Sequence, residues 1–156
     1  MIKRKQQRYL RYFMNSLVKM LDEDLEYHDH TLDGNTLYIT VFSNRKEVRC
    51  PFCGTLSSKT HSIYEKSFQD LPIQDKKVII RLMNRKLFCQ NSSCGCKTFA
   101  ERFEFIDFKA KKTHRLENKI REIALNCSTI SASNTLRRNT VDVSRTTISN
   151  LLKKQK

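Results

Sequence analysis

Six cysteines are the residues whose type and spacing give this sequence its clearest chemistry. The stretch CPFCG places Cys50 and Cys53 three positions apart, with a glycine directly after the second cysteine. A second group, in LFCQNSSCGC, contains Cys89, Cys94 and Cys96. Two short cysteine groups far apart in sequence can each supply two corners of a tetrahedral zinc site, where Zn–S distances are about 2.3 Å. The spacing therefore predicts one zinc ion held by four thiolates.

The first cysteine pair also favours metal binding through its local geometry. In a tight turn such as CPFCG, backbone N–H groups point at the thiolates and stabilise their charge. Gly54 is expected to take the positive φ that this turn requires. The spacing leaves the fourth ligand open, since Cys94 and Cys96 both follow Cys89 closely and His61 could compete. Four sulfur ligands would leave no open coordination position, so we expect a structural and not a catalytic metal.

Two other uses of the cysteines fit the sequence less well. The basic N-terminus lacks an uninterrupted apolar segment and a small-residue cleavage site, so it does not have the pattern of a secretory signal. We therefore expect a reducing, cytoplasmic compartment, where disulfides are disfavoured. A thioredoxin-like redox pair requires CxxC at the start of a helix, and no helical pattern follows Cys53. Cys127 lies on the apolar face of a predicted helix and is interpreted as a core residue.

The net charge is the second strong signal. The 156 residues contain 30 Lys and Arg against 16 Asp and Glu, which gives a net charge of +14 and an isoelectric point near 9.7. Such an excess favours polyanionic partners, nucleic acid above all, although some soluble proteins are simply basic. Residues 107–156 alone carry a net charge of +8, so we expect DNA contact to be concentrated there. No uninterrupted apolar run is long enough to predict a membrane span.

The pattern of apolar residues predicts an α+β fold in three consecutive parts. An amphipathic helix over 8–21 and a β-hairpin at the sequence TLDGN occupy residues 1–48. Extended stretches rich in β-forming residues carry the cysteines in a small zinc-binding domain over 49–108. A basic hinge, KAKKTHR, leads into a helical domain over 109–156. The apolar stripe of the first helix is interpreted as core, and it comprises Leu10, Phe13, Met14, Leu17, Met20 and Leu21.

The C-terminal part has the pattern of a helix-turn-helix domain. A longer helix begins after Thr113 as its N-cap, a short helix follows, and a third helix begins after Ser144. Ile148, Leu151 and the adjacent leucine form the apolar stripe of the third helix. Asn139 is the best candidate for a left-handed backbone conformation in the turn. The competing interpretation is a three-helix end cap with a polar surface.

The polar face of the third helix is predicted to read DNA. Short hydrogen-bonding side chains and an arginine near the start of an exposed helix can reach base edges in a major groove. The residues predicted to lie at the bases are Arg145, Thr146, Ser149 and Asn150, and Lys153 on the same polar face is a further predicted DNA contact. The residues predicted to face phosphates are Lys109, Lys111, Lys112, Arg115, Arg137 and Arg138. If this helix does not recognise the DNA sequence, the alternative is a smaller basic strip in the zinc-binding domain. That strip comprises Arg81, Arg85 and Lys86.

The order of these parts resembles the N-terminal half of bacterial insertion-sequence transposases of the L-three family. The resemblance rests on RCPFCG, on THSIYEKSFQDLP with His61, Tyr64 and Asp70, on RKLFCQNSSC, on Phe-Ala-Glu at 99–101 and on VSRTTISNLLK. It implies a zinc finger and a helix-turn-helix domain that together bind the terminal inverted repeats of a transposon. It also implies Cys94 as the fourth zinc ligand. The sequence departs from the family by lacking glycine near Asp75 and in the helix-turn-helix turn, and by having a cysteine at position 96.

The same family resemblance implies an Asp-Asp-Glu catalytic domain, and we expect the present chain to stop before it. After Phe108 the acidic residues are Glu117, Glu122 and Asp142, all in predicted short helices. These helices provide no sheet on which three carboxylates could converge on two metal ions. We therefore expect no enzymatic activity, and a chain that is either a truncated transposase or a separate DNA-binding module.

Two alternatives stay open at this point. The protein could be a stand-alone repressor that occupies the same repeats without cutting them. It could instead be a zinc-ribbon protein-interaction module, whose docking patch would comprise Phe99, Phe103, Phe105 and Phe108. We expect double-stranded DNA as partner, zinc as a structural cofactor, no membrane, no small-molecule substrate and a nucleoid-associated location. A homodimer is left open.

Overall fold

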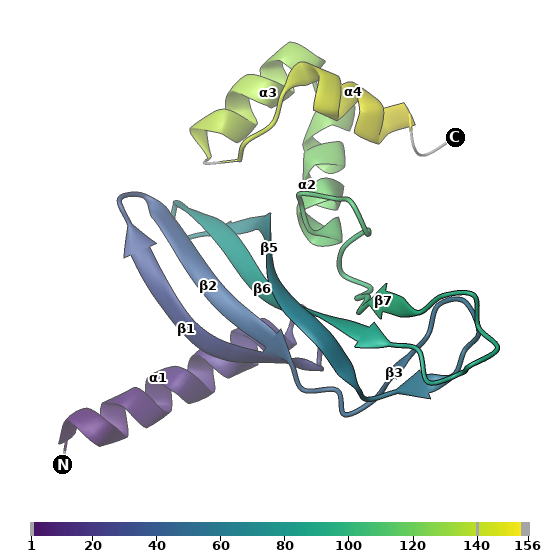
Figure 1. Ribbon diagram of the computed structural model, residues 1–156. Helices are drawn as coiled ribbons and strands as arrows, with labels where there is room; N and C mark the ends of the chain where they lie inside the picture. Colours follow the sequence, from purple (N-terminus) through teal and green to yellow (C-terminus); the bar gives the residue numbers. More distant parts are fainter. Residues whose placement is uncertain (1, 140, 154–156) are drawn as a thin grey trace. The chain divides into compact units, whose positions relative to one another are not determined.

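The computed structural model describes residues 2–139 and 141–153, with the backbone alone for 2–5, and in this range it contains four helices and a main β-sheet. The mixture confirms the predicted α+β class (Figure 1). The elements are α1 (Ile2–Lys19), β1 (Leu25–Asp33), β2 (Thr36–Ser43), β3 (Val48–Arg49), β4 (Leu56–Ser57), β5 (Thr60–Ile73), β6 (Lys76–Phe88), β7 (Thr98–Ala100), α2 (His114–Leu125), α3 (Thr129–Arg138) and α4 (Arg145–Lys153).

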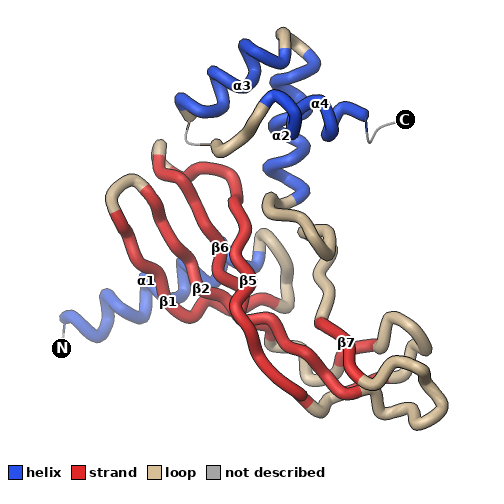
Figure 2. Tube along the Cα trace, turned by 45° about the horizontal axis from the view of Figure 1, so that its top comes forward, coloured by secondary structure: helices blue, strands red, loops and turns tan. Residues whose placement is uncertain are grey.

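The main sheet has the strand order β1-β2-β6-β5, and β7 pairs antiparallel with the end of β6 (Figure 2). Strands β3 and β4 form a separate two-stranded sheet. Along β6 the alternating residues Val78, Ile80 and Leu82 are buried, as their spacing predicts. The β5–β6 turn holds Gln74 and Asp75 at φ of 49° and 58°. Two successive positive φ values define the hairpin turn that favours glycine and asparagine, so the missing glycine leaves this turn strained.

The chain divides into two compact units, and each unit combines three separate segments of the sequence. The prediction was three consecutive parts. One unit comprises Met1–Asp29, Ile39–Lys66 and Arg81–Glu104, and it contains all the cysteines of the predicted zinc site. The other comprises His30–Tyr38, Ser67–Ile80 and Phe105–Lys156. The predicted boundary at 48/49 falls inside β3, and strands from either side of it pair in the main sheet, because β6 pairs with β2. Local sequence patterns carry no information on such long-range strand pairing.

Helix α1 is longer at its N-terminus than predicted, and part of its predicted core stripe is wrong. Met14 and Val18 are buried, whereas Leu10, Phe13 and Met20 are exposed. The backbone N–H of Tyr27 donates to Oδ1 of the Asn15 side chain at 2.8 Å. This bond fixes the rotation of α1 so that the face containing Met14 and Val18 packs inward. The other apolar face of the helix is left uncovered.

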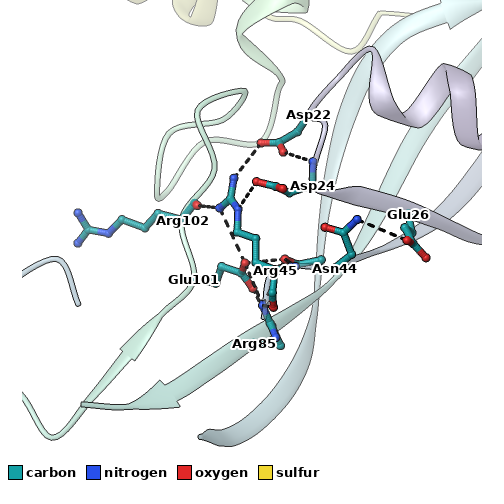
Figure 3. Close-up of polar contacts among 9 residues, drawn as sticks. Asp22, Asp24, Glu26, Asn44, Arg45, Arg85, Glu101 and Arg102 are labelled. Atoms are coloured by element: carbon teal, nitrogen blue, oxygen red, sulfur yellow. Dashed lines mark hydrogen bonds and ion pairs between the residues drawn. The ribbon is translucent and has the colours of Figure 1, made fainter. Parts of the chain in front are cut away.

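Two acidic residues after α1 form ion pairs within the protein. Asp22 and Asp24 both pair with Arg45, at 3.5 and 2.5 Å (Figure 3). Nε of Arg85 donates to the Glu101 carboxylate at 2.9 Å, and Ser43 Oγ donates to the same carboxylate at 2.6 Å. The Glu101 side chain is fully buried, so these donors replace the water it loses. Because Arg85 is held in this way, it is not available as part of a DNA-reading strip.

The C-terminal helices are capped as the sequence predicts at two positions. Thr113 Oγ1 accepts from the Leu116 N–H at 3.3 Å, and Ser144 Oγ accepts from the Thr147 N–H at 3.1 Å. Ser128 caps α3 in the same way. The three helices share one core, which comprises Leu116, Ile120, Ala124, Ala132, Leu136, Val141, Val143, Ile148 and Leu151. Each helix therefore buries one apolar stripe against the other two.

Two predictions for the helical part are wrong. Cys127 is exposed and not in the core, because α2 ends at Leu125 and the chain has already left the helix. Asn139 has φ of −93° and ψ of 27°, which is outside the left-handed region. The chain reverses instead through the backbone bond from Val141 N–H to the Leu136 carbonyl, at 2.9 Å.

Candidate functional site

Four cysteine sulfurs from two distant segments lie together in the first unit. The Sγ atoms of Cys50, Cys53, Cys89 and Cys94 all lie within 4.8 Å of one another. Cys53 and Cys89 approach to 3.5 Å, which is far longer than the S–S bond of about 2.05 Å in a disulfide. A tetrahedral shell with Zn–S distances of about 2.3 Å has S···S edges of about 3.8 Å. The spacing of the four sulfurs is therefore that of a closed zinc shell.

The first pair of sulfurs is presented by a short turn between β3 and β4. The Gly54 N–H donates to the Cys50 carbonyl at 2.9 Å, and the Cys50 N–H donates to the Thr55 carbonyl at 2.9 Å. Gly54 has φ of 74°, as predicted for this turn. A side chain at this position would strain the left-handed backbone. The sequence CPFCG therefore folds into the turn that points both thiols to the same side.

The second pair of sulfurs is presented by the loop between β6 and β7. The Cys89 N–H donates to the Lys97 carbonyl at 2.9 Å, and the Cys94 N–H donates to the Asn91 carbonyl at 3.1 Å. Behind the sulfurs, Cys50 packs with Leu87 and Phe99 in a small buried cluster. Strand β6 supplies Leu87 and β7 supplies Phe99, so the strand pair gives the metal site an apolar floor.

The two other candidate ligands lie outside the group of four sulfurs. The Cys96 thiol donates to the Thr98 carbonyl at 3.1 Å. His61 bonds through Nδ1 to Ser62 Oγ at 2.9 Å, and its ring packs on Phe88 with centroids 4.9 Å apart. The geometry therefore favours Cys94 as the fourth ligand.

The thiols differ in acidity when no cation neutralises them. Hydrogen bonds from the side chain and backbone of Thr55 lower the pKa of Cys53 to about 6. At Cys89, a hydrogen bond with the Asn91 backbone lowers the pKa, but burial and contact with the other cysteines outweigh it and raise the pKa to about 12. Zinc binds thiolates, so zinc binding releases the protons that these thiols otherwise carry.

The ribbon that holds the sulfurs is similar to a domain of known proteins. Residues 46–96 match the family model described as the zinc-finger of transposase IS204/IS1001/IS1096/IS1165. The matched range includes both cysteine pairs, and together with the tight four-sulfur group it supports zinc as a structural cofactor. No curated protein and no solved structure matches the chain significantly.

The residues predicted to read DNA lie on the outer side of α4. Arg145, Thr146, Asn150 and Lys153 are exposed, and Ser149 is half-buried. The opposite side of the helix carries Ile148 and Leu151, which are buried in the helical core, with Leu152 packed against it. Residues 145, 146, 149, 150 and 153 cover one face of a helix of 3.6 residues per turn. The polar face is thus presented outward as one surface.

The residues predicted to face phosphates fall into two groups. Lys109, Lys111, Arg137 and Arg138 are exposed, and the Arg137 Nε also donates to the Val143 carbonyl at 3.2 Å. Lys112 and Arg115 are partly buried. Burial lowers the pKa of Lys112, and Asp142 and Glu117 oppose that shift. The side chain of Arg115 is held by a carboxylate within the protein and is 39% exposed.

That carboxylate is Asp70, whose role sequence reasoning missed. Oδ1 of Asp70 accepts from Thr113 Oγ1 at 2.7 Å and from Arg115 Nε at 2.8 Å, and Oδ2 accepts from Arg115 Nη2. Asp70 is 1% exposed. Gln69 beside it exchanges backbone bonds with Lys111 and Thr113, at 2.8 and 3.1 Å. Strand β5 therefore fixes the start of α2 through one buried acid and a short parallel bridge.

The turn end of the β5–β6 hairpin also contacts the segment before α4. The Asp142 N–H donates to Oε1 of Gln69 at 3.1 Å, and Lys77 Nζ bonds to the Asp142 carboxylate. Asp142 lies between α3 and α4, so β5 and β6 restrain the segment that sets the direction of α4. The only sequence signal for these contacts is an acid placed between Phe68 and Leu71, in a strand where burial is expected.

The aromatic patch that would serve a protein-interaction module is mostly buried. Phe99, Phe103 and Phe105 lie in the interior, and Phe103 packs under the guanidinium of Arg45 at 4.8 Å. Phe108 is 58% exposed. The patch therefore does not form a docking surface. Among the described helices, none is both long and apolar enough to span a membrane.

Proposed function

We propose that this protein is the DNA-binding portion of a transposase-related system. Its ligand in this proposal is the double-stranded DNA of terminal inverted repeats. The observation that carries the proposal is the outward polar face of α4, which lies over a buried stripe in a strongly basic segment. The match of residues 46–96 to a transposase zinc-finger supports transposon ends as the DNA that is bound. In this proposal the zinc-binding segment is a rigid structural support, and the C-terminal helices contact the DNA bases.

The three C-terminal helices have the parts that a helix-turn-helix reader needs. In such readers the N-terminal residues of the second helix of the motif contact base edges. We assign that role to α4, with Arg145 and Asn150 as its strongest base readers. Arginine binds guanine through two hydrogen bonds, and asparagine binds adenine in the same way. Arg138, at the end of α3, and Lys111, before α2, would then contact phosphates on either side.

Removing a base contact and removing a phosphate contact should have different effects on DNA binding. Asn150→Ala should weaken binding to the preferred duplex by about 1–3 kcal/mol and relax the preference at one or two base pairs. Arg138→Ala should weaken binding to all duplexes alike and reduce the slope of log affinity against log salt by about 0.9. Fluorescence anisotropy over a salt series measures both.

A matched control keeps this test specific. Asn118→Ala removes an exposed asparagine from α2, whose Oδ1 accepts from Arg121 inside the protein at 2.6 Å. This variant should bind preferred and random duplexes like the parent protein. If Asn150→Ala loses affinity equally on both duplexes, α4 does not read sequence. A stand-alone repressor is the second candidate function, because it would use the same reader on the same repeats.

We further propose that residues 1–156 bind DNA without cutting it. Each acid after Phe108 is engaged by a basic neighbour: Glu117 pairs with Arg121, Glu122 with Lys119 and Asp142 with Lys77. Strand transfer requires carboxylates that converge on two metal ions about 3.5–4 Å apart. Supercoiled DNA incubated with Mg²⁺ or Mn²⁺ should therefore show no nicking above an empty preparation. Nicking that disappears in Glu117→Gln would contradict this.

A further inference from the structure

Helix α1 has two apolar faces, and its own unit covers one of them. Met14 and Val18 are buried. Five large residues of the helix are exposed, Tyr9, Leu10, Tyr12, Phe13 and Met20, with 75%, 47%, 76%, 59% and 75% of their surface exposed. Tyr9, Phe13 and Met20 lie across the helix from the buried pair, Tyr12 lies on one flank of that line, and Leu10 lies on the other, next to Met14. A helix that is apolar on both sides is normally buried on both sides. The exposed face is therefore expected to have a partner.

The spacing of this second face is that of a helix-pairing seam. Tyr9, Phe13, Ser16 and Met20 follow one another at intervals of four, three and four residues. Intervals of this kind form the a and d positions of a coiled coil. Ser16 does not interrupt the seam with an unpaired hydroxyl, because its Oγ donates to the Tyr12 carbonyl at 3.0 Å. The seam faces away from Met14 and Val18 on a helix of 3.6 residues per turn.

The charges on α1 favour a second helix over a polyanion as occupant of the seam. Arg8, Arg11 and Lys19 lie roughly 80° or more around the helix from the line of Tyr9 and Met20. A nucleic acid or an anionic membrane would need these basic groups beside the aromatic residues on the bound face. These three residues lie on the flank of the seam, next to Tyr12 and away from Tyr9, Phe13 and Met20, where charged residues of paired helices remain in water.

The exposed area is close to what a stable pair of chains requires. Aromatic side chains bury about 150–250 Å² each. Tyr9, Phe13 and Met20 on the seam, with Tyr12 and Leu10 on its two flanks, offer on the order of 600 Å² per copy, against about 800 Å² per partner in standard interfaces. The remaining area is small enough for the flanking side chains of α1 itself to supply.

We propose that α1 is a dimerisation helix, which pairs with α1 of a second copy of this chain through Tyr9, Phe13 and Met20. The proposal does not depend on DNA binding. If the protein does recognise inverted repeats, a two-fold dimer would present one reader to each half-site.

The test measures the mass of the full, zinc-loaded chain in solution. Sedimentation equilibrium over a concentration series should show a monomer–dimer equilibrium. The double variant Tyr9→Gln, Phe13→Gln should raise the dimer dissociation constant by at least about tenfold, since central aromatic residues dominate interfaces. Zinc content and helical circular dichroism should be unchanged. The matched control, Arg8→Gln with Arg11→Gln, changes two residues of the same helix off the seam and should leave the dimer intact.

Three results would overturn the proposal. The parent chain could remain monomeric at the highest concentration reached. The double variant could dimerise as well as the parent chain. The parent chain could be monomeric yet float with phosphatidylglycerol vesicles in a sucrose gradient, while the double variant stays at the bottom, which would make a membrane the occupant. A dimer lost in the seam variant and kept in the control supports the second copy.

Discussion

Removal of zinc should unfold the zinc ribbon, defined here as the β3–β4 turn and the β6–β7 loop (residues 48–57 and 89–97), and leave α2, α3 and α4 helical. Four thiols within 4.8 Å can be brought together at low cost only when a cation neutralises them as thiolates. The ribbon has little else to stabilise it, since its apolar floor consists of Cys50, Leu87 and Phe99. Structural zinc sites of this kind contribute folding energy directly. The helices have a separate core and their own N-caps.

Elemental analysis and amide hydrogen exchange together measure this effect. The parent protein should contain about one zinc per chain, and Cys53→Ser or Cys94→Ser should contain almost none. In the zinc-free protein the amides of Gly54 and Cys89 should lose protection, because the carbonyls they bond to lie within the ribbon.

Two cysteine variants serve as matched controls. Cys127→Ser removes an exposed thiol from the helical part and should retain stoichiometric zinc. Cys96→Ser should also retain it, since the Cys96 thiol bonds to the Thr98 carbonyl outside the group of four. Full zinc in Cys94→Ser combined with loss in Cys96→Ser would show that the ligand set is wrong. Parallel loss of helical signal on chelation would show that the helices depend on the metal.

Replacement of Asp70 should be clearly destabilising. Asp70→Ala should lower the free energy of unfolding by about 1–3 kcal/mol, since it leaves the buried Thr113 hydroxyl and the partly exposed Arg115 without their acceptor. It removes the acceptor of Thr113 Oγ1 and of Arg115, and it weakens the attachment of β5 to the start of α2. Urea titration followed by circular dichroism gives the free energy.

A neighbouring ion pair offers the control for this substitution. Asp107 pairs with His114 at 3.0 Å on the surface, at the entrance of the same helix. Asp107→Ala should cost about 0–1 kcal/mol, because water replaces an exposed partner. In a double-mutant cycle, Asp70→Ala and Arg115→Ala together should cost clearly less than the sum of the two single changes. Equal losses for Asp70→Ala and Asp107→Ala would show that the buried acid does not anchor the helix.

The parts of the fold set by local chemistry could be predicted from the sequence. The spacing of Cys50 and Cys53, the positive φ of Gly54 and the caps at Thr113 and Ser144 each depend on a few adjacent residues. The alternation along β6 likewise identified its buried face.

The parts set by distant contacts could not be predicted. Asp70 and Arg115 are 45 residues apart, and no local pattern pairs them. Arg85 had the appearance of a free basic residue because the buried Glu101 that binds it lies on another segment. In α1, helical periodicity detects apolar residues, but it does not say which of two apolar faces packs inward. The bond between Asn15 and Tyr27 decides that, and it depends on the tertiary fold.

Selection of bound duplexes from a random pool tests the central claim most directly, because the target sequence need not be chosen in advance. The zinc-loaded chain should enrich one base-pair pattern over successive rounds, and Asn150→Ala should enrich a pattern that is relaxed at one or two positions. A pool that stays random would contradict sequence-specific binding by this protein. Recovery of the same unrelaxed pattern by Asn150→Ala and by a variant lacking Arg145 would contradict reading by α4.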